Sequence, residues 1–574
     1  MIEFSEDRAD VLIVGGGGAA ARAAIEAHDA GAFVILATKR RLGAGGATGY
    51  PVAEFAGLAV ADKCEDSTDT PDLHLEDILQ SGMEMCDEEL SRILTTEALQ
   101  TIPNLENWGV TFERDKDDNY LITKGCFSSR ARNYKLKDHG RKIITALTRQ
   151  IQTRQIKVLE ETMLVDIVTR DNEVIGAFLL QHDGTLVLVR TNAIVLGTGG
   201  AGQLFKFNMN PSDITGDGHA AGFRAGAKLV NMEFVQYGIG TVPELLLFPH
   251  WLWPFCPALK NSQGKEFLSD YLPKGVTEKM VMESHGAHYP FTNRLVSRYI
   301  ELAIQKEIIA GRTSINGGIY ADFIGKLDKQ NLPDATEKLW RAICESYARR
   351  GFEITKKPIE IACHAHAMNG GLRVNKNGET RVQGLFAAGE VAGGPHGADR
   401  LGGGMLTACQ VFGKRAGLAA AKRKRRCLAD TPMDESIKLF SELIEGLKQS
   451  GKNGTHLVGD LRQELQENSS RNLMLVRNET GLKSYIKKLS EIETNLNMHA
   501  VIVSPEDLIA ALELRNLLET GRIIANSALV RKETRGSHLR EDYPITTEKA
   551  ERLIVERTQE GTIQVCARPV GKNH

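Results

Sequence analysis

A glycine-rich turn near the N-terminus is the first group of residues whose types and spacing could do chemistry. Four glycines, Gly15 to Gly18, are followed by Ala19 and Ala20. Glycines permit a tight turn and a close approach of backbone to a pyrophosphate, and Ala20 still permits close helix packing. A helix that starts here offers N–H groups and a partial positive charge to phosphate. The turn predicts a dinucleotide site at Gly15, Gly17, Gly18, Ala19 and Ala20.

The elements around this turn follow a recurring order. Short runs rich in valine and isoleucine occur at 11–14, 33–37, 164–168, 174–180, 186–189 and 193–197. Helical stretches such as 19–30, 88–108 and 141–153 alternate with them, which is typical of a parallel sheet covered by helices. The region 240–355 breaks the glycine-rich pattern and carries helices around 293–310 and 335–350. The chain is helical and charged from about 433 to 530.

This order predicts an α/β fold with a Rossmann-like nucleotide-binding domain, an inserted domain, a C-terminal helical domain and a polar tail. We expect the nucleotide-binding domain at 1–240 and 356–428, the inserted domain at 241–355, the helical domain at 429–545 and the tail at 546–574. A chain of 574 residues is expected to form several domains, because single cores stop growing near ~250 to 300 residues.

The composition is that of an ordinary soluble globular protein, with 71 basic and 73 acidic side chains. It does not call for nucleic acid or a membrane surface as a partner. A strand begins almost at the N-terminus, so we expect no signal peptide and a cytoplasmic location. No uncharged apolar run of roughly 18 residues predicts a membrane span. The nine cysteines form no C-x-x-C pair, so we expect no metal or cluster site in this chain.

Further glycine clusters narrow the choice of dinucleotide. They lie at 43–49, 197–202 and 216–218, and together they suit a long ligand that lies along the backbone. The second strand ends at Thr38-Lys39, without the acidic residue that binds the adenosine ribose in many NAD proteins. The pattern therefore disfavours NAD as the resident cofactor.

Several motifs, in order and spacing, resemble those of the succinate dehydrogenase/fumarate reductase flavoprotein family. They are Thr215-Gly216-Asp217-Gly218, Met-Glu-Phe-Val-Gln at 232–236, Gly389-Glu390, His-Gly-Ala-Asp-Arg-Leu-Gly-Gly at 396–403, Arg-Gly-Ser-His at 535–538 and Arg-Glu-Asp-Tyr-Pro at 540–544. The match runs from the N-terminus to about Gly417 and resumes in the C-terminal domain. The resemblance implies FAD, an α+β capping domain over the flavin, and hydride transfer between the flavin and a substrate carbon.

The same resemblance implies roles for particular residues in holding FAD. Lys39 is expected near the adenosine end, Thr198 and Gly199 near the ribityl chain, and Asp217 and Glu390 at hydroxyls of the cofactor. Met405 and Leu406 would begin a helix aimed at the flavin ring, where a helix N-terminus favours negative charge. Further contacts are expected at Thr38, Gly45, Gly46, Gly200 and Arg400.

The substrate site matches the family less well. The family holds a dicarboxylate with two histidines, a threonine with a glutamate, and two arginines, because cations neutralise carboxylates. Arg400 and His366 match one arginine and one histidine. Asn293 stands where the proton-delivering arginine is expected, and the adjacent Arg294 would point about 100° away on a helix. The Thr-Glu-Gly segment of the family falls approximately on Pro-His-Trp at 249–251, which makes His250 a further candidate.

A second histidine of the family is lost, because its Gln-Phe-His-Pro-Thr segment is Gln-Tyr-Gly-Ile-Gly here, at 236–240. Two of the four tryptophans lie in the nearby segment 248–255. They fit a packed domain core or a contact with a bulky substrate equally well. The catalytic candidates are thus Arg400, His366, Arg294 and His250.

These observations predict an FAD-dependent oxidoreductase of the fumarate reductase type. It would transfer hydride between flavin and a C=C or C–C bond of a small anionic substrate that is bulkier or less charged than fumarate. Two alternatives stay open: a flavin-bearing electron-transfer subunit, or an enzyme like L-aspartate oxidase or adenylylsulfate reductase. An iron–sulfur or other electron-transfer subunit is a plausible partner, because this chain carries no cluster motif.

We expect the FAD to be bound noncovalently. Family members with covalent flavin carry a histidine shortly after the second strand, and residues 40–50 contain none. Acid precipitation of the purified protein should release yellow colour into the supernatant. Colour that remained in the pellet would contradict this prediction.

Overall fold

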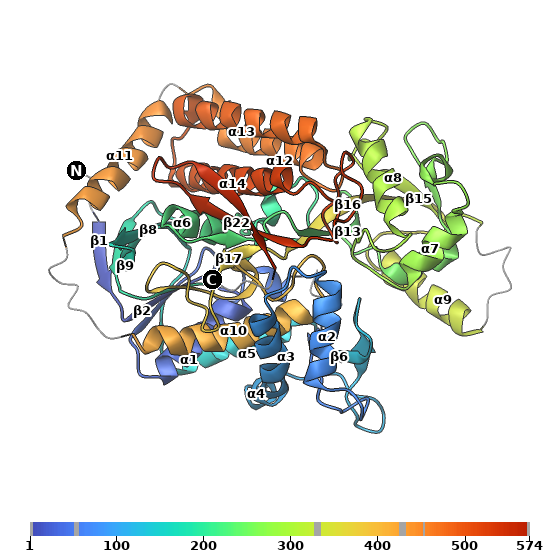
Figure 1. Cartoon of the computed structure of the whole chain (residues 1–574), viewed down its shortest axis with the longest axis horizontal. Coiled ribbons are helices and arrows are strands. Elements are labelled where there is room, and N and C mark those ends of the chain that lie inside the picture. The colour runs from blue at the N-terminus through green and yellow to red at the C-terminus, as the bar shows by residue number, and fades with distance from the viewer. Residues whose placement is uncertain (1–3, 51–56, 326–333, 424–431, 452–453, 571–574) are drawn as a thin grey trace. The chain divides into compact units, whose positions relative to one another are not determined.

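The computed structural model describes residues 4–50, 57–325, 334–423, 432–451 and 454–570, which form two compact units (Figure 1). The larger unit contains 1–235, 367–473 and 477–574, and the smaller unit contains 236–366 with 474–476. The chain thus leaves the larger unit and returns to it, as expected for an inserted domain. The division into five parts stays a prediction, and its boundary at 428 lies outside the described residues.

A parallel five-stranded sheet is the centre of the larger unit. Its order is β18 (Leu385–Ala387), β11 (Ile194–Leu196), β2 (Val11–Val14), β3 (Val34–Ala37) and β7 (Lys157–Leu159). β2 and β3 are buried at every residue, as expected for a parallel sheet that is covered on both faces. Each buried valine, leucine or isoleucine contributes about 1.5–3 kcal/mol through the hydrophobic effect. The Rossmann-like α/β prediction is confirmed.

Two helices of this unit pack along each other at very short range. They are α1 (Gly18–Asp29), which follows β2, and α10 (Gly404–Ala421). A Cβ added at Gly413 would lie 2.7 Å from the carbonyl oxygen of Ala19, and one at Gly417 would lie 2.9 Å from the Cα of Ala23. Only glycines allow the two backbones to approach this closely, so the small residues fix the relative position of the two helices.

The remaining helices of the first 235 residues surround this centre. They are α2 (Pro71–Ser81), α3 (Glu88–Glu97), α4 (Thr101–Asn107), α5 (Gly140–Thr153) and α6 (Asp217–Arg224). Local chemistry sets their starts: the Thr70 side chain caps α2 by accepting the Leu73 N–H, and Asp87 caps α3 by accepting the Leu90 N–H. The amphipathic α5 buries Ile143 and other residues spaced three or four apart.

Three further sheets of three or more strands lie in the described part of the larger unit. One has the order β1 (Phe4–Arg8), β10 (Leu186–Arg190), β9 (Glu173–Gln181) and β8 (Thr162–Arg170). A second is β4 (Gly57–Ala59), β6 (Ala131–Lys135) and β5 (Ile122–Lys124). The third is β19 (Ala392–Gly393), β17 (Gly371–Arg373), β12 (Leu229–Val230), β22 (Glu551–Arg557) and β23 (Ile563–Pro569).

The third sheet changes the interpretation of the C-terminal segment. The sequence predicts a polar tail after Pro544, but β22 and β23 form an antiparallel hairpin whose first strand pairs with β12. Leu553, Ile554 and Val555 are buried in it. The short apolar run between charged residues is therefore a strand that completes a sheet.

The helical region consists of α11 (Asp434–Gly451), α12 (Val458–Asn472), α13 (Glu479–His499) and α14 (Pro505–Val530), with β20 (His456–Leu457) paired to β21 (Ala500–Val501). Figure 1 shows α12, α13 and α14 side by side. Ser504 and Asp507 form a capping box at the start of α14. Even α14, at 26 residues, does not qualify as a membrane span, and neither does any other helix in the described ranges.

The smaller unit is built on a four-stranded sheet with the order β13 (Val235–Thr241), β16 (Ile359–Met368), β15 (Ile319–Asp322) and β14 (Ala258–Lys260). Its helices are α7 (Glu278–Gly286), α8 (Arg298–Ile309) and α9 (Asp334–Ala348). Strands and helices together give the α+β character expected of the inserted domain. The predicted helix at 293–310 is wrong at its start, because 293–297 form turns and α8 begins at Arg298.

The close approach of α1 and α10 yields a stability prediction. We expect Gly417→Ala to destabilise the protein by about 1–3 kcal/mol, because the new methyl group overlaps the backbone of Ala23. It should also weaken FAD retention, since α1 carries the glycine turn. Gly446→Ala in α11 is the matched control, because a Cβ there meets no atom within 4 Å. Equal melting temperatures for the two variants would contradict the packing argument.

Candidate functional site

The glycine turn joins β2 to α1 in the geometry that a bound phosphate requires. Gly15 has a φ of 120°, and a Cβ there would collide with the carbonyl oxygen of Gly197. The N-cap residue Gly17 supplies no side-chain acceptor, and the Gly18 N–H donates to the Thr48 hydroxyl at 3.0 Å. The start of α1 therefore presents backbone N–H groups and the positive end of the helix dipole.

The second glycine cluster lies directly beside this turn. Gly46 has a φ of 78°, and a Cβ there would be 3.3 Å from the Cα of Gly17. The Gly46 N–H donates to the Asp213 carboxylate at 2.9 Å, and a Cβ at Gly45 would lie 2.8 Å from the same carboxylate. The structure thus brings together two glycine segments that are predicted to face one ligand.

Lys39 and Asp217, two predicted cofactor residues, contact each other. The Lys39 amine lies 3.0 Å from the Asp217 carboxylate and donates to Thr215 and Glu513, each at 2.6 Å. Burial disfavours the charged amine, but Asp217 and Glu513 outweigh it and raise the pKa of Lys39. Asp217 also accepts from Thr215 and Asn516. This ionic cluster fixes both side chains at the end of β3 and the start of α6.

Glu390 and Gly200 form a second close contact among predicted residues. A Cβ at Gly200 would lie 2.5 Å from the Glu390 carboxylate, which accepts the Met368 N–H at 2.9 Å. Burial raises the pKa of Glu390, against the opposing effects of the Met368 N–H and of Arg400. Nearby, the Thr198 hydroxyl is buried and has no hydrogen-bond partner among the described residues.

Arg400 lies just before α10, whose N-cap Gly403 has a φ of 77°. Its guanidinium is partly buried and donates to the carbonyl of Leu401 at 3.2 Å. Burial lowers the pKa of Arg400, while Glu390, Cys126 and Cys409 act in the opposite direction. An arginine keeps its charge under such conditions, so this position supplies a permanent cation next to the start of a helix.

Three residues around Arg400 are missing from the sequence-based candidates. Cys126 is partly buried, and its carbonyl accepts the Gly402 N–H at 3.1 Å. Cys409 is buried on α10, and burial raises the pKa of its thiol to about 12. Burial and then Arg400 lower the pKa of His396 to about 3, so its imidazole is neutral near pH 7. The sequence predicts no role for the two cysteines, because they lack the spacing of metal ligands. Nothing in the sequence relates them to Arg400.

In the smaller unit, His366 lies on β16 with Tyr289 against its ring. The two ring centroids are 6.3 Å apart at an interplanar angle of 89°. A Cβ at Gly238 would lie 2.5 Å from the Cζ of Tyr289, whose hydroxyl donates to the carbonyl of Ile239 at 3.3 Å. Tyr289 therefore occupies the space beside the position where the family has its other histidine. Sequence reasoning missed Tyr289 because it is 51 residues away from Gly238.

The other catalytic candidates of the smaller unit, His250 and Arg294, both lie near the buried His288: burial, then His285, and further His250 and Arg294 lower its pKa to about 3. Arg294 is exposed, and its backbone N–H donates to the Thr292 hydroxyl within a turn. Asn293 is partly buried, and its carbonyl accepts from Arg298 at 2.6 Å. The expected helical offset between residues 293 and 294 does not apply, because neither is helical. His250 is partly buried, and burial followed by His285 lowers its pKa.

Most of the aromatic segment 248–255 belongs to the core of the smaller unit. Trp253 is fully buried, with ring centroids 4.9 Å from both Phe248 and His285. Phe255 packs on Trp340 at 4.7 Å. Only Trp251 of the two tryptophans is partly exposed. The packing interpretation therefore holds for Trp253, and a substrate contact is restricted to Trp251.

Comparison with protein families gives two matches that together span most of the chain. A family model described as FAD binding domain matches residues 10–406. A second, described as fumarate reductase flavoprotein C-term, matches residues 462–572.

Individual proteins are similar to this chain over nearly its whole length. One subunit of the fumarate reductase (CoM/CoB) of Methanothermobacter marburgensis is 35% identical over 95% of this chain and 96% of its own length. L-Aspartate oxidase of Streptomyces coelicolor is 28% identical over 93% of this chain and 89% of its own. The solved structure of Mycobacterium smegmatis Sdh1 in complex with UQ1 is 27% identical, has a TM-score of 0.84, and covers 100% of this chain and 95% of that one.

The contact between Gly238 and Tyr289 can be tested by a double-mutant cycle. We expect Gly238→Ala to destabilise the protein by about 1–3 kcal/mol, because its methyl group overlaps the phenol ring. In a Tyr289→Ala background the same substitution should be much less harmful, giving an interaction energy of about 1 kcal/mol or more in chemical denaturation. Additive effects of the two substitutions would show that the two side chains do not share this space.

Proposed function

The chain belongs to the succinate dehydrogenase/fumarate reductase flavoprotein family and is an FAD-dependent oxidoreductase, and from this premise we propose that its substrate is a small organic anion other than fumarate. The reaction is hydride transfer to or from a C=C or C–C bond of that substrate. The observation that carries the proposal is the position of Tyr289, whose ring lies where the family has a histidine and contacts the retained His366.

The residues of the larger unit fit FAD. The start of α1 has N–H groups and no side-chain cap, and the buried Thr198 hydroxyl has no protein partner in the described part of the chain. Gly15, Gly17 and Gly18 would hold the pyrophosphate, and Thr198 would bond the ribityl chain. When bound, FAD supplies the hydride-accepting and hydride-donating ring. Because residues 40–50 contain no histidine, we propose that FAD is bound noncovalently.

We assign Arg400 the task of binding the carboxylate of the substrate. Its guanidinium can donate two parallel hydrogen bonds to a carboxylate, and partial burial strengthens such bonds relative to water. Glu390 is one of the groups whose charge acts on Arg400. The guanidinium keeps its charge, so it would attract the carboxylate of the substrate.

We look for the proton donor of the reaction among the candidates of the smaller unit. Asn293 cannot deliver a proton, because a carboxamide does not ionise in the physiological range. Arg294 is exposed, and His250 belongs to a different segment. His366 is retained from the family and its ring neighbours the ionisable Tyr289, so we propose one of these two residues as the proton donor.

The substituted positions also indicate the class of substrate. A dicarboxylate needs two cationic binding groups, and this chain has a glycine at 238 and an asparagine at 293 where the family has a histidine and an arginine. An aromatic side chain in the same place favours an apolar group on the substrate. We therefore propose an unsaturated or saturated monocarboxylate with a larger apolar body.

A second candidate function is that of a flavin-bearing electron-transfer subunit. The loss of two cationic positions supports it, and the retained Arg400 and His366 speak against it. In either case an iron–sulfur or other electron-transfer subunit is the proposed partner, because the sequence lacks the spaced cysteines of a cluster site. An amino-acid oxidase activity would be revealed by oxygen consumption with L-aspartate.

Anaerobic reoxidation of the reduced flavin distinguishes these functions. The purified protein is reduced, and unsaturated monocarboxylates, enones, sulfur compounds and fumarate are added one at a time. We expect an unsaturated monocarboxylate to restore the absorption of oxidised flavin at a rate in the enzymatic range of about 1–10³ s⁻¹. Arg400→Lys should slow this step at least tenfold, because a lysine cannot pair bidentately. Arg92→Lys on the exposed face of α3 is the matched control.

Two results would contradict the proposal in different ways. Turnover of fumarate or succinate at enzymatic rates would show that the substrate class is wrong. Failure of every compound, with normal flavin content, would favour the electron-transfer function.

A further inference from the structure

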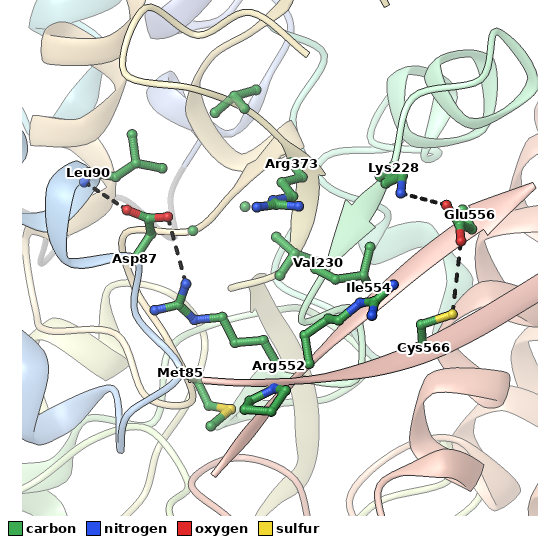
Figure 2. A pocket seen from close by; sticks show the side chains of 15 residues that line it. Met85, Asp87, Leu90, Lys228, Val230, Arg373, Arg552, Ile554, Glu556 and Cys566 are labelled. Carbon is green, nitrogen blue, oxygen red and sulfur yellow. Dashed lines mark hydrogen bonds and ion pairs between the residues drawn. The ribbon is translucent and has the colours of Figure 1, made fainter. Parts of the chain in front are cut away.

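A cavity of about 330 Å³ lies in the larger unit, and its lining includes none of the residues assigned to FAD (Figure 2). One wall is the sheet of β12, β17, β19, β22 and β23, and the other is the chain between α2 and α3 with the first turn of α3. Met85, Leu90, Val230 and Ile554 give it an apolar lining. Its volume is in the range of small-molecule sites, about 300–1,000 Å³.

The charged groups of this lining are mostly cationic. The cations are Lys228, Arg373, Arg552 and Arg568, and the carboxylates are Asp87 and Glu556. Lys228 pairs with Glu556 at 2.7 Å, and Arg552 lies 3.7 Å from Asp87. The cations thus outnumber the carboxylates by two, which gives the cavity a positive potential.

Arg552 provides an independent sign of a missing partner. Its terminal nitrogens reach the Cys86 carbonyl and the Asp87 carboxylate, but its Nε–H is buried without a hydrogen-bond partner in the described residues. A buried donor without an acceptor is unfavourable. In Figure 2 the side chain of Arg552 extends from β22 toward Asp87, below Arg373. An anion among these groups would satisfy the donor.

We propose that this cavity binds a small organic anion with an apolar body, in the class of aromatic monocarboxylates. The carboxylate would lie among the arginines, and the apolar body on Met85, Val230 and Ile554. A second, more open hollow of about 730 Å³ adjoins the cavity and shares Lys228 and Arg373 with it. It provides a route from solvent for the ligand.

The same elements connect the cavity to the segment that leads to Arg400. The Asp87 N–H donates to the Gly394 carbonyl at 2.8 Å, and the Ser91 hydroxyl donates to the Pro395 carbonyl at 2.9 Å. A ligand that binds Arg552 would compete with the contacts of Arg552 to Cys86 and Asp87. Asp87, which donates to Gly394, would then be held less firmly. The site therefore serves as an effector site that acts on the flavin environment through residues 394–400.

Calorimetric titration of the full-length, FAD-loaded protein tests the site with three probes. Phenylacetate carries charge and an apolar body, phenylacetamide has the body without the charge, and acetate has the charge without the body. We expect saturable binding of phenylacetate, and binding at least tenfold weaker for the other two. The titration is repeated with Arg400→Lys, which should retain this binding because it alters only the proposed substrate site.

Variants at exposed positions separate the cavity from other anion sites without threatening the fold. The double variant Arg373→Gln/Arg568→Gln removes two cations of the lining, and both side chains are exposed. We expect at least a tenfold loss of phenylacetate affinity. Arg557→Gln is the matched control, an exposed arginine of β22 outside the cavity lining.

Four results would overturn the proposal. Unchanged affinity in the double variant, or no binding to the wild-type protein, would show that the cavity is not an anion site. Loss of binding in Arg400→Lys would place the probe in the substrate site instead. Binding that leaves the reduction potential and absorption spectrum of the flavin unchanged would overturn the effector role. A shift in that potential, absent from the double variant and present in Arg557→Gln, is the expected result.

Discussion

The close contact of α1 with α10 is the constraint on which the rest of the larger unit depends. Gly413 and Gly417 press directly on the backbone of Ala19 and Ala23, so neither helix can slide or rotate without separating the pair. One helix starts at the glycine turn, and the other starts four residues after Arg400. Two positive helix ends are therefore held in fixed relation by the packing of one backbone on the other.

A buried ionic network supports the same region from the C-terminal part of the chain. Arg531 donates to both Glu233 and Glu533, each at 2.7 Å, and Arg535 donates to Glu533 and to the Met83 carbonyl. Charges removed from water require pairing, because breaking a buried ion pair destabilises a protein by about 3–5 kcal/mol. The Ser537 hydroxyl, two residues further on, donates to the Ala398 carbonyl at 3.0 Å. The Arg-Gly-Ser-His motif therefore supports the segment that leads to Arg400.

Sequence reasoning succeeded where a local pattern has one physical meaning. A buried strand followed by glycines and an alanine-rich helix could be predicted at 11–30, because the strand, the turn and the helix start are all local. The pairing of Lys39 with Asp217 could not, since the residues are far apart in the chain and each looks like a ligand contact by itself. The hairpin of β22 and β23 could not be predicted for a related reason. Its apolar run is short, and its partner β12 is more than 300 residues earlier in the chain.

The packing around Gly238 shows how side-chain volume couples substitutions that look independent in sequence. In the sequence, the absence of a histidine at 238 indicates only that one polar side chain is lost. In the structure, the space beside Gly238 holds the phenol ring of Tyr289. A histidine could return to that position only if Tyr289 moved, and Tyr289 is also the ring against His366. The glycine, the tyrosine and the retained histidine thus form one packing unit. The three positions are therefore coupled by volume, and a change at residue 238 has to be interpreted together with the ring at residue 289.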